Sequence, residues 1–281
     1  MNKFYQDVEK ELKAIVGDNG EVVVQEVRKN NGTVLHGVSI KYSQDTKVLP
    51  VAYMEDCKGN PHEAAVEIID AIREAMENCP IVADVNVTKF TSFEEVRDKI
   101  IPRLVNAEAN KEMLADIANT PFFDLAIVYT VVLGSNSNGQ YSYKISKDIL
   151  KNWGLSVEEI HQIAMQNLKS LPAKTFSLSE MFPSEMFSGD PLPLYVLTNE
   201  QSVNGAAMVL NENTLEKYLD MFGTNKLSII PSSIHEVIIT AATDAVDIDE
   251  MVKEVNSSTV SPEEVLSDHQ YFYTREKGLY C

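Results

Sequence analysis

A short segment in the last third of the chain concentrates side chains that take part in nucleophilic catalysis. Pro231–Glu236 carries two hydroxyls, an imidazole and a carboxylate, and it joins two apolar runs. The groups belong to Ser232, Ser233, His235 and Glu236. Serine, histidine and an acid are the residue types of a hydrolase triad, but neighbours in sequence seldom converge on one proton path. Serine hydroxyls that bond the backbone of a turn explain them as well. The pattern favours a structural turn; contact with a ligand or partner and catalysis are the alternatives.

The sequence contains no other recognised catalytic or binding motif, because the residues that such motifs need do not occur at the required spacing. The chain has no GxGxxG or GxxxxGK[ST] phosphate loop and no GxSxG nucleophile elbow. His-Glu pairs at 62–63 and 235–236 begin like the zinc motif HExxH, but Val66 and Ile239 replace the second histidine. The five histidines and three cysteines form no close ligand set. We expect neither a metal nor a cofactor.

Two further positions carry groups that titrate. Glu55 and Asp56 could act as paired carboxylates in acid–base chemistry, although acids that follow a strand are usually just solvated. His36 alternates with Val34 and Val38 on what should be a buried strand face. We interpret it as a core histidine with its hydrogen bonds satisfied rather than as a ligand.

The composition is that of an acidic globular chain. Its 281 residues carry a formal net charge of −18, from 42 acids and 24 bases, and 44% of them are hydrophobic. Binding to phosphates requires a basic surface, so we expect no direct nucleic-acid binding. The acids concentrate in residues 51–100 and 201–250. They could meet a basic partner or imitate DNA, but solubility through net charge is the simpler explanation.

Targeting signals are not recognisable. Acidic residues interrupt the first apolar positions, which argues against a secretory signal. No window approaches the roughly 20 apolar residues of a membrane span. Cys57, Cys79 and Cys281 form no CxxC pair, and reduced thiols explain them. We expect a cytoplasmic protein with no membrane segment.

Local patterns place these residues on hairpins and helices. Apolar spacing predicts a helix from about Lys3, and an Asn-Asn-Gly turn joins two strands, Glu21–Arg28 and Thr33–Lys41. Asn60 and Glu63 form the capping-box pattern of the next helix.

The middle of the chain is less regular. We predict a helix over Asn106–Ala118 and a strand over Phe122–Leu133, which forms a hairpin with Tyr141–Ile145. Ser156 and Glu159 open a further helix with a capping box.

The last third alternates short strands with helices. Apolar runs predict strands over Leu194–Thr198, Ala206–Leu210, Leu227–Ile230, Val237–Ala241 and Tyr271–Tyr273. A helix opens at Asp247. Its predicted inner face consists of Ile248, Met251, Val252 and Val255.

Hairpins outnumber strand–helix–strand alternation. The sequence therefore favours an α+β fold with mainly antiparallel sheets built from hairpins and with helices packed on them. We divide the chain into an N-terminal lobe, residues 1–118, and a C-terminal lobe, residues 119–281, with a single domain as the alternative.

Several strings carry a resemblance over most of the chain. They are Leu-Ser-Asp-His-Gln-Tyr-Phe-Tyr at 266–273, Leu-Tyr-Val-Leu-Thr-Asn-Glu at 194–200, Asn-Gly-Ala-Ala at 204–207 and Ile-Pro-Ser-Ser-Ile-His-Glu at 230–236. With them the chain resembles an uncharacterised protein family of Gram-positive gut bacteria, known only as a domain of unknown function. The resemblance implies a bacterial cytosolic protein and transfers no activity.

We expect a non-enzymatic intracellular protein that binds or regulates a protein partner. One alternative is an unfamiliar hydrolase that uses Ser232 or Ser233 with His235 and Glu236. The other is an acidic DNA mimic, which predicts acids arranged in a stripe.

Overall fold

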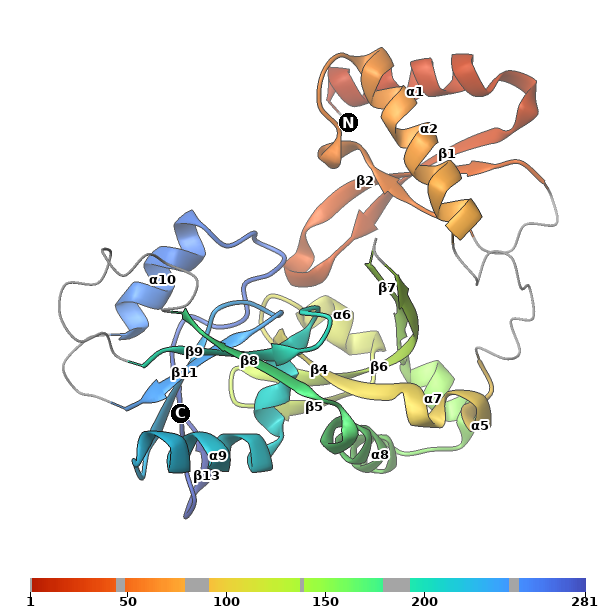
Figure 1. The fold of residues 1–281 in the computed structure, drawn as a ribbon. Helices are drawn as coiled ribbons and strands as arrows, with labels where there is room; N and C mark the ends of the chain where they lie inside the picture. Colours follow the sequence, from red (N-terminus) through yellow and green to blue (C-terminus); the bar gives the residue numbers. More distant parts are fainter. Residues whose placement is uncertain (1, 44–48, 79–90, 137–138, 179–192, 243–247) are drawn as a thin grey trace. The chain divides into compact units, whose positions relative to one another are not determined.

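The protein is represented by a computed structural model that describes residues 2–43, 49–78, 91–136, 139–178, 193–242 and 248–281. The chain divides into two compact units, Met1–Thr88 and Lys89–Cys281. Each combines helices with antiparallel sheet (Figure 1). The predicted α+β class is therefore confirmed.

The first unit is a three-stranded sheet with two helices on one face (Figure 1). Its helices and strands are α1 (Lys3–Val16), β1 (Glu21–Arg28), β2 (Val34–Lys41), β3 (Ala52–Tyr53) and α2 (Pro61–Asn78), with 3-10 turns η1 (Gly17–Asn19), η2 (Asn30–Gly32) and η3 (Met54–Asp56). The sheet order is β1-β2-β3. Leu12, Ile40 and Ile68, one each from α1, β2 and α2, are fully buried at its centre.

Local signals in this unit act as predicted. Asn31 and Gly32 adopt positive φ angles of 55° and 70° in the turn between β1 and β2. The Asn60 side-chain oxygen accepts from the Glu63 backbone N–H at 3.1 Å, and a Glu63 carboxylate oxygen accepts from the Asn60 N–H at 3.0 Å. Two backbone donors at the start of α2 are thereby satisfied.

The second unit contains two sheets around one main core. Its first part consists of α5 (Phe93–Val96), η4 (Arg97–Lys99), β4 (Ile100–Asn106), α6 (Lys111–Asp116), β5 (Asn119–Phe122), β6 (Leu125–Asn136), β7 (Gly139–Lys144), α7 (Lys147–Trp153) and α8 (Val157–Ser170). Its second part consists of β8 (Ala173–Ser177), β9 (Tyr195–Asn199), η7 (Gly205–Leu210), α9 (Glu212–Phe222), β10 (Leu227–Pro231), β11 (Val237–Ala241), α10 (Ile248–Ser258), β12 (Tyr271–Thr274) and β13 (Gly278–Tyr280).

The two sheets follow the two parts of the sequence. One has the order β4-β6-β5, with β7 paired to β6, and the other has the order β13-β12-β10-β11-β9-β8. Side chains from both sheets meet in the main core, where Tyr129, Leu197 and Ile229 are buried together with η7 and the inner faces of α8 and α9.

The unit boundary lies thirty residues before the predicted one. The prediction divided the chain between residues 118 and 119, whereas the compact units divide between 88 and 89. The reason is that β4 pairs with β6 from Ile100 opposite Val131 to Asn106 opposite Leu125. A division at 118 would separate these two strands.

Two differences from the predicted elements lie in the middle of the chain. The Asn106 side-chain oxygen accepts from the Ala109 N–H at 2.9 Å, so a turn replaces the first part of the predicted Asn106–Ala118 helix. The predicted strand Phe122–Leu133 is divided into β5 and β6 by a turn in which Phe123 has a φ of 56°.

The predicted strand Ala206–Leu210 is instead the 3-10 helix η7. All of its residues are buried. A short apolar run without polar positions shows no period, so it does not separate a buried strand from a buried helix.

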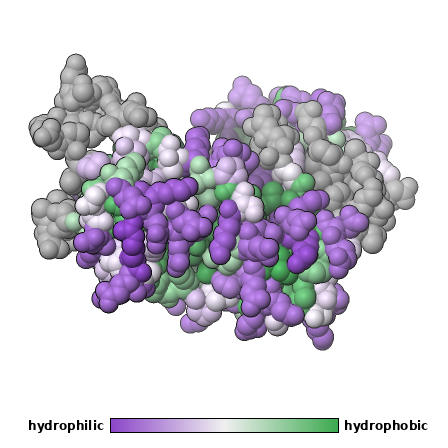
Figure 2. Space-filling view, turned by 60° about the horizontal axis from the view of Figure 1, so that its bottom comes forward, coloured by the Kyte–Doolittle hydropathy of each residue, from purple (hydrophilic) through white to green (hydrophobic). Residues whose placement is uncertain are grey.

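The surface of the described residues is largely hydrophilic on the face drawn in Figure 2, where hydrophobic residues appear in smaller patches. None of the helices described combines the length and the hydropathy that a membrane crossing requires.

Candidate functional site

The segment Pro231–Glu236 forms the connection between β10 and β11. The Ser233 hydroxyl accepts from the His235 backbone N–H at 3.0 Å, and the Ser233 N–H donates to the Glu236 carbonyl at 3.2 Å. The Ile234 N–H donates to the carbonyl of Glu264 at 2.8 Å. The first two are bonds of a turn, and the third attaches this turn to Glu264. The four predicted residues lie near one another because they share this one short connection.

His235 is held through both ring nitrogens. Nδ1 accepts from the Asn204 backbone N–H at 3.1 Å, which leaves the proton of the neutral ring on Nε2. Nε2 lies 3.4 Å from a carboxylate oxygen of Glu264. Neither nitrogen is directed at Ser232 or Ser233, so the arrangement favours a structural role for the imidazole over that of a general base.

A groove begins where this segment leaves β10. We call it the α10 groove; its volume is about 430 Å³. It is lined by Leu194, Ile230, Pro231, Ser232, Ile238, Thr240, Ile248, Met251, Val252, Val255 and Asn256. Two of these residues, Pro231 and Ser232, belong to the segment Pro231–Glu236. Its other four residues do not line the groove.

The outer wall of the groove is an apolar helix face that the fold leaves exposed. Ile248 and Val252 are buried, but Met251 and Val255 are 46% and 43% exposed. The prediction placed all four residues inside the protein and is wrong for these two. Because Met251 and Val255 are exposed beside the groove, α10 can make further apolar contacts there with a bound molecule.

The floor of the groove holds a buried hydroxyl. Thr240 in β11 is 1% exposed, and its Oγ1 has no hydrogen-bond partner among the described residues. A buried polar atom without a partner is costly, so a ligand that supplied a donor or acceptor here would remove that cost.

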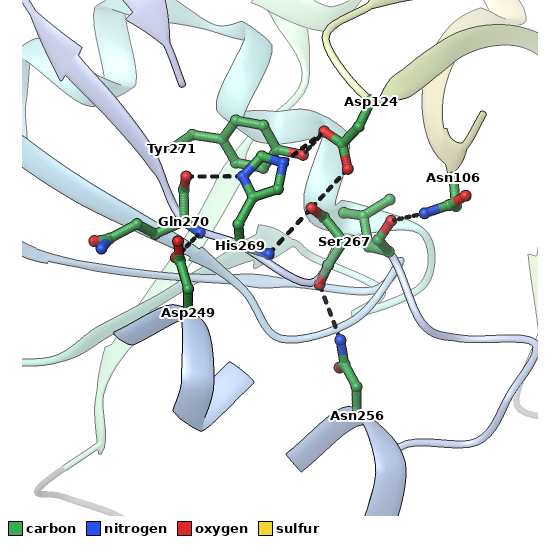
Figure 3. A network of polar contacts seen from close by, with 9 residues as sticks. Asn106, Asp124, Asp249, Asn256, Ser267, His269, Gln270 and Tyr271 are labelled. Atoms are coloured by element: carbon green, nitrogen blue, oxygen red, sulfur yellow. Dashed lines mark hydrogen bonds and ion pairs between the residues drawn. The ribbon is translucent and has the colours of Figure 1, made fainter. Parts of the chain in front are cut away.

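A polar cluster, which we call the Asp124 hub, holds the segment before β12 (Figure 3). Asp124 lies in the turn between β5 and β6, and its carboxylate accepts from Ser267 Oγ at 2.8 Å and from the Tyr271 hydroxyl. His269 Nε2 lies 3.3 Å from the same carboxylate. Asn106 Nδ2 donates to the Leu266 carbonyl at 3.1 Å.

The hub also fixes α10. Asp249, near the start of the helix, accepts from the Gln270 N–H at 2.8 Å (Figure 3). Asn256, near its end, donates to the Ser267 carbonyl and to the Asp268 carboxylate, each at 2.9 Å. Because Asn256 also lines the groove, the hub fixes the position of α10, which forms the groove wall.

The hub contains serine, histidine and aspartate, but not in the geometry of a triad. Ser267 is fully buried, and its hydroxyl bonds to Asp124 rather than to an imidazole nitrogen. Burial, and then the hydrogen bond to Asp124, raise the pKa of Tyr271 far above its ordinary value. The hub therefore positions elements and carries no activated nucleophile.

A second polar cluster lies in the first unit. His36 Nδ1 is 2.7 Å from a Glu55 carboxylate oxygen, and both carboxylate oxygens are 3.0 Å from the His36 backbone N–H. The Tyr5 ring lies 4.5 Å from the imidazole, centroid to centroid. His36 is thus hydrogen-bonded as predicted, but it is half-buried rather than a core residue. Glu55 is its partner rather than half of a carboxylate pair with Asp56.

Sequence reasoning missed both the groove and the hub. The four apolar residues of α10 have the spacing of one packed face, so no local pattern shows that two of them stay exposed. Ser267, His269 and Tyr271 lie in the Leu-Ser-Asp-His-Gln-Tyr-Phe-Tyr string that carried the family resemblance. Their partner Asp124 is 143 residues from Ser267, and no local pattern shows that pairing.

Comparison with known proteins identifies a family. The model of a family of unknown function, DUF5688, matches residues 1–275. No curated protein and no solved structure matches the chain. The match covers nearly the whole sequence, so the chain belongs to the DUF5688 family, and the predicted resemblance to a family of unknown function is confirmed.

Proposed function

We propose that this member of the DUF5688 family is a non-enzymatic intracellular binding protein and that a protein partner inserts an apolar segment into the α10 groove. The observation that carries the proposal is the groove itself, with the exposed Met251 and Val255 on its wall and the unpartnered Thr240 hydroxyl at its floor. Apolar walls supply affinity, and a few polar atoms fix the orientation of what binds.

The charge around the groove favours a partner with basic residues beside its apolar ones. Glu250 and Glu254 are exposed and one turn apart on α10, and Glu254 is also one turn from Met251. Complementary charge increases the rate of association and selects the register of binding.

The test is photo-crosslinking in the native lysate with a benzophenone amino acid at position 255. We expect one protein to crosslink in stoichiometric yield and Met251→Glu to abolish that product. Met221→Glu is the matched control, because Met221 is also an exposed methionine, 51% against 46%, on another helix of the same unit. Equal crosslinking in the two variants would contradict the proposal.

Thr240→Val gives an independent check. The substitution removes the unpartnered hydroxyl with little change of shape, so the free protein should be as stable or more stable. A bound segment that uses the hydroxyl would lose roughly 3- to 10-fold in affinity, equivalent to about 1 kcal/mol.

The contacts of the His235 ring do not support the hydrolase alternative, because Nδ1 accepts from Asn204 and Nε2 lies beside Glu264 rather than beside a serine. It retains a direct test, because any turnover that depends on the segment would disappear in His235→Ala. Turnover that persisted in that variant would remove the segment from the chemistry.

DNA mimicry is favoured by one observation, an acidic stripe on α2. Glu63, Glu67, Asp70 and Glu74 are exposed at helical spacing along one side. A mimic should bind poly-lysine with a steep salt dependence that the triple variant Glu67→Gln, Asp70→Asn, Glu74→Gln reduces. The same affinity in the variant would remove this candidate.

A further inference from the structure

The four-stranded sheet of the second unit holds an arginine that has no acidic partner among the residues that the structure describes. β6 has an irregularity between Val132 and Gly134, and β7, paired with it, turns out of the plane of β4 and β6 (Figure 1). Arg103 of β4 donates through Nη2 to the Gln140 side-chain oxygen and to Ser142 Oγ at 3.0 Å, both on β7. Both acceptors are neutral.

The guanidinium is desolvated but has no carboxylate partner among the described residues. Burial lowers the pKa of Arg103 to about 10. Its Nε is buried and lacks a hydrogen-bond acceptor in the described chain. Buried charges in proteins are normally paired, because removing one ion from water without a partner is expensive.

A second unpartnered group lies on the same face of the sheet. Thr130 of β6 is fully buried, and its Oγ1 has no hydrogen-bond partner among the described residues. It stands opposite Ile101, which is two residues from Arg103 and therefore on the same face. On its other side Thr130 stands opposite Lys144 of β7, which brings a second cation to this face.

The composition of these strands is unusual for so acidic a chain. The protein has 42 acids and 24 bases, yet β4, β6 and β7 contain arginine and lysine and no acidic residue. Arg103 keeps part of its surface accessible, as do Gln140, Ser142 and Lys144. An ion from solvent can therefore approach Arg103, and contact with its buried Nε and with Thr130 Oγ1 requires neighbouring side chains to move.

We propose that this part of the sheet is a binding site for a small oxyanion, a carboxylate or a phosphate, with Arg103 as its principal ligand and Thr130 as a second hydrogen-bond donor. Several oxygens on one ion can accept from both groups, and a guanidinium matches the geometry of these anions. The site is distinct from the α10 groove and does not depend on the function proposed for it.

The experiment is a titration of the full chain with sodium phosphate, sodium acetate or sodium chloride at constant ionic strength. The readouts are the melting temperature and the ¹H–¹⁵N resonance of Arg103 Nε. At a hundredfold excess over Kd we expect phosphate or acetate to raise the melting temperature by about 5 °C and to shift the Nε resonance. The oxyanion that produces these changes at the lower concentration identifies the ligand class. Chloride should change neither the melting temperature nor the Nε resonance.

Arg103→Met should lose the response while remaining at least as stable as the parent in chloride, because it removes an unpaired buried charge. Arg97→Met, at an exposed position, should keep the full response. If Arg103→Met does not fold, Arg103→Lys keeps the charge without the Nε donor and should bind at least 10-fold more weakly. No response to either oxyanion in the parent, an undiminished response in Arg103→Met, or unweakened binding by Arg103→Lys would overturn the proposal.

Discussion

Single residues decide how closely the chain can pack around the Pro231–Glu236 turn. Gly205, the first residue of η7, lies against β9 and the turn. A Cβ on Gly205 would overlap with Thr198 Oγ1 and would lie 2.6 Å from the Asn199 nitrogen and 2.7 Å from the His235 oxygen. Two of these atoms are backbone and cannot rotate away, so only glycine fits.

Gly205→Ala should therefore lower the free energy of unfolding by about 1 to 3 kcal/mol through overpacking. Chemical denaturation measures the change. Gly134→Ala is the control, because a Cβ there meets nothing within 4 Å, and it should change stability by less than about 1 kcal/mol. Equal effects at the two positions would show that the predicted overlap is relieved by movement.

A different residue-scale effect depends on pH. Burial pushes the pKa of Glu55 upward, but the hydrogen bonds from the His36 ring and backbone outweigh it and hold that pKa below its ordinary value of 4.5. A carboxylate with a lowered pKa stabilises the folded state above its unfolded pKa, and the contribution is lost as the pH falls through the folded pKa.

Glu55→Gln should accordingly be less stable than the parent at pH 7, and the difference should shrink as the pH falls below about 4.5 toward 3. Denaturation midpoints at both pH values give the comparison. Asp56→Asn removes the adjacent carboxylate and leaves the one bonded to His36, so its curve should follow the parent more closely. A difference for Glu55→Gln that stays constant with pH would refute the linkage.

At the scale of elements, the Asp124 hub determines where α10 lies. Its bonds to Asp249 and Asn256 hold the helix near both ends, while Ile248 at the start and Val252 in the middle pack against Ile230. A helix fixed by polar contacts at its ends can keep part of its apolar face available.

Asp124→Asn should loosen this arrangement. The amide keeps the shape but offers a donor where Ser267 and Tyr271 also donate, and we expect a loss of about 2 kcal/mol. Hydrogen exchange should show reduced protection in α10 as well as in β12. Asp116→Asn, at an exposed position in α6, is the control, and the same protection in both variants would disprove the role of the hub.

The sequence predicts those elements whose signals are local. Turn chemistry at Asn31 and Gly32 and the capping box at Asn60 act within four residues, and both are found as predicted. Tertiary context decides the rest. Whether Met251 is buried depends on what packs beside α10, and the partners of Asp124 lie more than 140 residues away.

At the scale of the whole molecule, the two units have separate hydrophobic cores. Every member of the core with Leu12 and Ile68 precedes residue 89, and every member of the core with Tyr129 follows it. A unit that buries its own apolar residues can fold without the other.

Residues 1–88 and 89–281, produced separately, should each fold cooperatively. Circular dichroism and the dispersion of amide resonances would show it, and their melting temperatures should reproduce those in the full chain. The matched control is residues 119–281, the C-terminal fragment of the sequence-based division, which lacks β4 as the partner of β6 and should not fold. A cooperatively folded 119–281 fragment would contradict the assignment.

The position of β12 near the end of the sequence delays the completion of the fold during synthesis. Ser267 and Tyr271 emerge 143 and 147 residues after Asp124, which at roughly 5 to 20 residues per second is a delay of about 7 to 30 s. β10 ends at Pro231 and β12 begins at Tyr271, so for the last 40 residues of that interval one edge of β10, which β12 later covers, is open to pairing with other chains. The first unit can complete its fold meanwhile, whereas the second completes its six-stranded sheet only when its last two strands are made.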